Sequence, residues 1–180
     1  RKHPHRSIQA LTSAGITNKL LLKIIAQHHE QADGSGYPEG LSGTDILPEA
    51  EILALSERYV AMITKRAYRN RMTITAARKL IATLGDGKVR PAIPRSLLQV
   101  LGEYPPGMLV RLDNNEVGVV TGRAVRARGP FVKAIFGPRG NRYSGTFERD
   151  TSVPEYNIQG AEEPEEMPSM DFSLLWGFRN

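Results

Sequence analysis

The sequence contains no cysteine, and none of its apolar runs approaches the roughly 20 residues that span a bilayer. Without cysteine there is no disulfide framework and no thiolate chemistry, which suits the cytoplasm, where we expect this segment to work. No signal-peptide pattern is present either, so we expect no membrane contact. The chain begins with Arg1 rather than Met, and we expect it to be a segment of a longer protein.

Charge is unevenly distributed. After residue 154 six acidic residues accompany a single arginine, so residues 1–154 carry a formal charge of +10 although the whole chain carries +5. Such a basic body favours a polyanionic ligand, although surface lysine and arginine also serve solubility alone. No nucleic-acid-binding signature is present, and we expect no nucleic-acid partner.

Two of the four histidines, His28 and His29, stand side by side between an apolar run and a glycine-rich segment. Neutral imidazole is a common ligand for zinc, iron and related ions, and paired ions about 3.5–4 Å apart are typical of phosphoester hydrolases. The alternative is a helix end where one histidine caps carbonyl groups and the other faces water. The pair alone leaves both interpretations open.

Hydrophobic periodicity and capping residues predict five helices in the first two thirds of the chain. The second, which starts after Asn18 and ends at the histidine pair, is nearly apolar on all sides, so we expect it to be buried. The five predicted ranges are residues 4–14, 19–29, 48–65, 73–84 and 94–101.

Glu57 interrupts the apolar character of the predicted helix 48–65, because Leu53, Val60 and Ala61 lie one turn away. A carboxylate in such a position is costly unless it is paired or bound to a cation. Two interpretations follow: a metal ligand, or a boundary position at which Glu57 pairs with Arg58 or a lysine.

After a Tyr-Pro-Pro-Gly turn at residues 104–107 the periodicity changes from helical to alternating. Residues 108–112 and 117–119 predict a hairpin, residues 131–136 a third strand, and residues 143–153 one or two more. We therefore expect a mainly α domain over residues 1–104, a small antiparallel β module over 105–157 and an acidic mobile tail over 158–180, α+β in total.

The string HHEQADGSGYPEGLSG, with Arg66-Ala67-Tyr68-Arg69 further on, closely resembles the HD-GYP family of cyclic-di-GMP phosphodiesterases, a branch of the HD metal-dependent phosphohydrolases. The resemblance runs from His3 to about Tyr104. It implies an HD-type helical bundle and hydrolysis of cyclic-di-GMP in bacterial second-messenger signalling.

The resemblance also implies residue roles. His3, His28 and His29 match the family's histidine ligands, and Glu57 stands where its last metal ligand is usually aspartate. Two or three divalent ions, of iron, manganese or zinc, would then activate a hydroxide. The basic residues of the later motif, which face the dinucleotide in the family, are Arg66 and Arg69. The triplet through which the family contacts signalling partners, such as a GGDEF-type domain, is Gly36, Tyr37 and Pro38.

Departures from the family pattern bear on activity. No histidine is followed by aspartate, so the HD pair and the earlier ligands are absent. In the family they lie upstream of the residue matched by His3, and we therefore expect the bundle to be incomplete at its N-terminus. Glu57 is one methylene longer than aspartate, and Val60 replaces a second family aspartate.

Three functional hypotheses follow. The first is a segment of a metal-dependent cyclic-di-GMP phosphodiesterase, inactive by itself. The second is a degenerate HD-GYP domain that binds the dinucleotide or a signalling partner without catalysis. The third is a helical interaction module whose histidines are structural.

Overall fold

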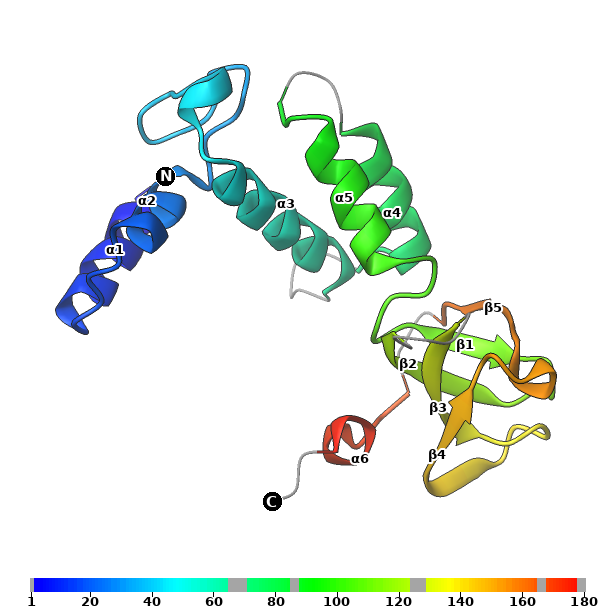
Figure 1. Cartoon of the computed structure of the whole chain (residues 1–180). Coiled ribbons are helices and arrows are strands. Elements are labelled where there is room, and N and C mark those ends of the chain that lie inside the picture. The colour runs from blue at the N-terminus through cyan, green and yellow to red at the C-terminus, as the bar shows by residue number, and fades with distance from the viewer. Residues whose placement is uncertain (1, 65–70, 85–87, 124–128, 165–167, 178–180) are drawn as a thin grey trace. The chain divides into compact units, whose positions relative to one another are not determined.

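The computed structural model describes residues 2–64, 71–84, 88–123, 129–164 and 168–177. Contacts divide the chain into two compact units, Arg1–Val100 and Leu101–Asn180. The first unit is helical and the second is built on a β-sheet (Figure 1).

In the first unit α1 packs against α2, α2 against α3, and α3 against α4. The elements are α1 (His3–Ser13), α2 (Lys19–Gln27), the short 3-10 helix η1 (Gly43–Asp45), α3 (Pro48–Ile63), α4 (Ile74–Thr83) and α5 (Ala92–Leu101). The glycine-rich segment between α2 and α3 is the predicted loop.

Local capping explains where these helices begin. The Asn18 side chain accepts a hydrogen bond from the backbone N–H of Leu21 at 3.0 Å, and Thr73 caps α4 in the same way through Ala76 at 3.1 Å. Pro48 opens α3, where its missing N–H costs nothing. The five predicted helices are confirmed, with α5 beginning two residues before the predicted position.

The expectation that α2 is buried is wrong. The helix α2 packs against α1 and α3, and Leu20 and Leu21 remain 54% and 41% exposed. The core of this unit forms between α3 and its neighbours instead. Its buried apolar residues are Ile46, Ala50, Leu55, Tyr59, Met62, Ala77, Ile81 and Ile93.

The second unit contains a five-stranded antiparallel sheet in the order β4-β3-β2-β1-β5. The predicted hairpin is confirmed, because Leu109 pairs with Val119 and Val110 with Gly118. With the helices of the first unit this makes the chain α+β, as predicted. The strands are β1 (Leu109–Leu112), β2 (Val117–Arg123), β3 (Pro130–Phe136), β4 (Arg142–Asp150) and β5 (Ile158–Glu162).

Residues after 157 differ from the predicted mobile tail. β5 pairs with β1 along its whole length, and a short helix, α6 (Phe172–Trp176), buries Leu175 against Leu109 and Val119. The segment of β5 is ordered by its backbone hydrogen bonds to β1, although its side chains give no strand signal. A 3-10 turn, η2 (Pro154–Tyr156), precedes β5. The predicted boundaries at residues 104 and 157 stay predictions.

A buried carboxylate ties two strands of this sheet together. Glu116, just before β2, is 3% exposed and accepts hydrogen bonds from Arg149 Nε at 2.7 Å and Arg149 Nη2 at 2.8 Å, both from β4. The Tyr143 hydroxyl donates a third bond at 2.7 Å. Hydrogen bonding from Arg149, above all, lowers the pKa of Glu116 to about 2.

No helix among the described residues has both the length and the apolar composition needed to cross a bilayer.

Candidate metal centre

The packing of α1 against α2 brings together three histidines that are distant in sequence. His3 is the first residue of α1, while His28 and His29 directly follow α2. His3 Nε2 lies 2.9 Å from His28 Nε2 and 3.2 Å from His29 Nε2. One ligand atom from each of the three rings lies within 4.8 Å of the others. The structure thus brings together the three histidines that the sequence singled out.

The orientation of the His28 ring is set by the helix that precedes it. Nδ1 of His28 lies 2.6 Å from the carbonyl oxygen of Ile25. Because a carbonyl oxygen only accepts, Nδ1 carries the proton and the Nε2 lone pair faces His3. Metal-binding histidines are oriented by such a bond from the second ring nitrogen.

The imidazole nitrogens have spacings that suit a single divalent cation. Bonds of about 2.0–2.1 Å at right or tetrahedral angles separate two ligand nitrogens by roughly 2.9–3.4 Å. The distances of 2.9 and 3.2 Å fall in this range. Ring nitrogens this close require either a shared proton or a cation between their lone pairs. The donor set therefore fits the metal that the sequence predicted.

Burial favours the neutral, metal-binding form of His29. Desolvation first, and then the neighbouring His28 and His3, lower its pKa from 6.5 to about 4. At neutral pH the ring is uncharged and has a lone pair available for a metal.

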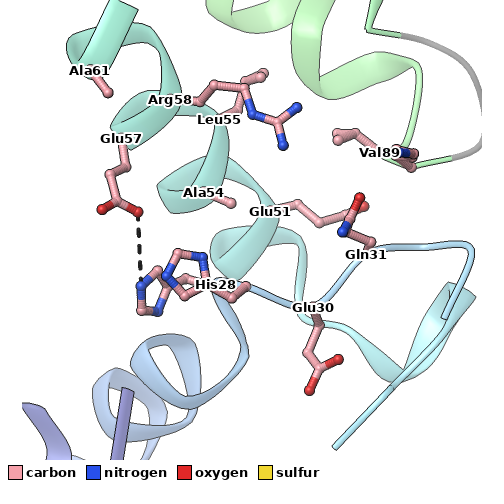
Figure 2. Close-up of a pocket in the computed structure, with 12 residues that line it drawn as sticks. His28, Glu30, Gln31, Glu51, Ala54, Leu55, Glu57, Arg58, Ala61 and Val89 are labelled. Carbon is pink, nitrogen blue, oxygen red and sulfur yellow. Dashed lines mark ion pairs between the residues drawn. The ribbon is translucent and has the colours of Figure 1, made fainter. Parts of the chain in front are cut away.

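Glu57 projects from α3 toward the same cluster. Its Oε2 lies 3.9 Å from His28 Nε2, and Figure 2 shows the carboxylate directed at that ring. The side chain is 53% exposed, so Glu57 is not the costly buried acid that its apolar neighbours suggested. It lies beside the three imidazoles, and its role as a fourth ligand stays a prediction.

A cavity of about 310 Å³ adjoins the imidazoles. Its wall includes His28, His29 and Glu57 together with two cations, Arg58 and Lys88, that the sequence analysis did not assign to a site (Figure 2). Arg58 follows Glu57 on α3, which is the signal that could have identified it. Lys88 is distant from these residues in sequence, and only the folding of the chain brings it to the cavity. The wall also contains the carboxylates of Glu30, Glu51 and Glu57, so the charge around the cavity is mixed, with the two cations available to a phosphate group.

Beneath the cavity, a buried ion pair that sequence reasoning missed connects distant segments. Glu51 on α3 is 2% exposed and pairs with Arg90 at 2.9 Å. Arg90 Nη2 also donates to the carbonyl oxygens of Ile46 at 2.6 Å and Gly43 at 3.1 Å. The pair thus joins the start of α3 to the chain after α4.

The structure places the Gly36-Tyr37-Pro38 triplet near the histidines, with the Tyr37 ring centroid 4.7 Å from that of His29. Pro38 lines a separate small cavity with Pro4. The predicted substrate residues Arg66 and Arg69 lie outside the described residues.

Comparisons with known proteins complete the description of the site. The sequence model of the HD domain family matches residues 1–90. The chain is similar to cyclic di-GMP phosphodiesterase PA4108 of Pseudomonas aeruginosa, at 28% identity over 100% of this chain and 42% of the relative. It is also similar to the cyclic di-GMP phosphodiesterase response regulator RpfG of Xanthomonas campestris, at 36% identity over 43% of this chain and 21% of the relative.

A solved structure described as Bd1817, a HDG"Y"P protein from Bdellovibrio bacteriovorus, superposes with a TM-score of 0.44 at 25% identity, covering 56% of this chain and 31% of that one. The chain spans less than half the length of the two curated relatives.

Proposed function

Because this chain belongs to the HD domain family, we propose that it forms part of a metal-dependent phosphodiesterase that hydrolyses cyclic-di-GMP in bacterial signalling. The resemblance predicted from the sequence is confirmed by the match over residues 1–90 and by relatives named cyclic di-GMP phosphodiesterases. The observation that carries the proposal is the convergence of the ring nitrogens of His3, His28 and His29.

These three imidazoles, with Glu57 beside them, would hold divalent metal. The family resemblance implies two or three ions, and the four side chains are fewer ligands than that number needs, so this chain would supply one part of the site. Divalent ions in such sites activate water and polarise a phosphoryl oxygen. Imidazole and carboxylate ligands suit iron, manganese and zinc.

The residues of this chain have three tasks in such a reaction. The bond from His28 Nδ1 to Ile25 holds one ring in its ligand orientation, and burial keeps His29 neutral. Arg58 and Lys88 can donate hydrogen bonds to a phosphate held in the cavity. We also assign phosphate or guanine binding to Arg66 and Arg69, as the resemblance implies.

The second candidate is a degenerate domain that binds cyclic-di-GMP without hydrolysing it. It is favoured by the position of Glu57, whose nearest carboxylate oxygen is 3.9 Å from His28 Nε2 and whose side chain is largely in solvent. A ligand that holds a catalytic ion must be placed to within about 0.5 Å.

Two further proposals come from the resemblance alone. A GGDEF-type or other signalling domain would bind through the loop that contains Gly36, Tyr37 and Pro38. The segment would act in the cytoplasm, as the absence of cysteine suggests.

The test uses the full-length protein. Metal content is measured by elemental analysis, and hydrolysis of cyclic-di-GMP is followed by chromatography. We expect more than one equivalent of metal and formation of a linear product in the wild type. His28→Ala and His29→Ala should lose metal and activity. His5→Ala is the matched control, because His5 is exposed and lies outside the imidazole cluster.

The results separate the two candidates. Wild-type protein that binds cyclic-di-GMP but contains no metal and yields no product would refute hydrolysis and support the receptor function. Equal losses in His5→Ala and His28→Ala would refute the assignment of the cluster as the metal site.

A further inference from the structure

The loop between α2 and α3 folds back over the second histidine of the pair. The backbone N–H of Tyr37 donates to the carbonyl oxygen of His29 at 3.1 Å. Gly36 passes so close to the preceding chain that an added Cβ would overlap the backbone of Glu30 and Gln31. Only glycine permits this approach, so the path of the backbone itself places Tyr37 next to His29.

A buried carboxylate fastens the loop on the far side of Tyr37. Glu30 is 4% exposed, and its two oxygens accept separate backbone bonds, from Glu39 N–H at 2.7 Å and from Leu41 N–H at 3.0 Å. A buried charge is tolerated when both oxygens are hydrogen-bonded in this way. Glu30 directly follows His29, so the same short segment carries the imidazole and the anchor of the loop.

The loop places the Tyr37 ring against the His29 ring. Their centroids are 4.7 Å apart and the planes are inclined by 32°, a tilted stack in the range of favourable aromatic pairs. Among the described residues, the Tyr37 hydroxyl has no hydrogen-bond partner. The contact therefore depends on the face of the ring rather than on the hydroxyl.

The two histidines of the pair are oriented by different means. His28 donates from Nδ1 to Ile25, whereas no partner for His29 Nδ1 occurs among the residues that the structure describes. His29 nevertheless directs Nε2 to within 3.2 Å of His3 Nε2. The His29 imidazole is instead restrained by ring contacts: the His28 centroid lies 4.1 Å from it, and the Tyr37 ring, at 4.7 Å, is the contact that comes from outside the three histidines.

We propose that Tyr37 is a positioning residue that holds the His29 imidazole toward His3, and that Glu30 secures the loop that carries it. For its effect on metal binding this inference rests on the proposed function. The ring contact itself exists without metal and is tested separately.

The ring contact is tested by NMR of full-length protein carrying labelled histidine, without added metal. A neighbouring aromatic face shifts imidazole protons upfield, so we expect the His29 ring protons, assigned with His29→Gln, to move downfield in Tyr37→Leu. They should stay in place in Tyr37→Phe. The exposed His5 ring is the internal reference, and cross-relaxation between the Tyr37 and His29 rings is expected in the wild type.

The positioning role is tested by Zn²⁺ affinity, measured by competition with a chelator. Partners that orient metal ligands typically contribute 10- to 100-fold, so Tyr37→Leu should weaken binding by that factor while Tyr37→Phe stays near wild type. Tyr104→Leu, a tyrosine in the second unit, is the matched control.

The inference is overturned by unchanged His29 resonances in Tyr37→Leu, or by the absence of cross-relaxation in the wild type, which needs no variant to fold. It is also overturned if the resonances move but Zn²⁺ affinity does not. A wild-type protein with no measurable metal affinity refutes the proposed function instead, and the ring resonances then decide whether Tyr37 holds His29.

Discussion

Replacing Glu116 by glutamine tests the buried carboxylate that joins β2 to β4. The substitution keeps the shape of the side chain but removes the charge that faces Arg149, whose Nε and Nη2 donate to it at 2.7 and 2.8 Å. Lowering the pKa of Glu116 from 4.5 to about 2 corresponds to about 3 kcal/mol in favour of the folded state at neutral pH. Because Glu116 is almost fully buried, little of this is screened by solvent. We expect Glu116→Gln to lower the free energy of unfolding of the second unit by about 3 kcal/mol at pH 7.

The effect should depend on pH with a definite sign. A carboxyl whose pKa is lowered by folding stabilises the protein fully above the unfolded pKa, here about 4.5, and the stabilisation is lost as pH falls toward 2. At pH 3 about 1 kcal/mol should remain. The difference between wild type and Glu116→Gln should therefore shrink by more than half between pH 7 and pH 3.

Urea denaturation followed by tryptophan fluorescence measures this difference. Trp176 is the only tryptophan in the sequence and lies in α6, so its emission reports on the second unit. Glu148→Gln is the matched control, because Glu148 is 81% exposed and lies 3.9 Å from Lys133; it should change stability by less than about 0.5 kcal/mol. A loss below 1 kcal/mol in Glu116→Gln at pH 7, or an equal loss at pH 3, would refute the reasoning.

Three other predictions concern the first unit. Glu57→Asp should raise hydrolysis of cyclic-di-GMP by the full-length protein severalfold, because it restores the carboxylate length usual in the family; unchanged turnover would argue against Glu57 as a ligand. Gly36→Ala should lower the free energy of unfolding by about 1–3 kcal/mol, measured by circular dichroism in urea, since its Cβ would overlap the Glu30 backbone. Arg90→Ala should cost about 3–5 kcal/mol in the same assay, because it leaves Glu51 buried without its cation, and a cost under 1 kcal/mol would contradict the role of this pair.

The helices were predictable because their signals are local. Asn18 and Thr73 cap through bonds that span three residues, and Pro48 opens α3 through its own ring. The burial of α2 was mispredicted because burial depends on which neighbours pack against a helix. Periodicity does not identify those neighbours.

The candidate site was predictable only where the type of residue itself indicated a metal ligand, as with the adjacent histidines. His28 and His29 are adjacent in sequence, but the approach of His3 depends on the packing of α1 against α2. Glu30 and Arg90 bond mainly to backbone groups of distant segments, and no sequence pattern records such partners. Lys88 was missed for the same reason, because only the fold brings it to the cavity wall.

Strand β5 forms one edge of the sheet, a position that β1 would otherwise occupy. An uncovered β1 would present unpaired peptide groups beside fully buried apolar residues. The edge strand of a second copy could then pair with it through backbone hydrogen bonds. β5 is a poorer template, since it is short, contains Gly160 and ends in Glu162, with another glutamate next in the chain. We therefore infer that β5, by covering β1, leaves this edge of the sheet a weaker template for a second copy.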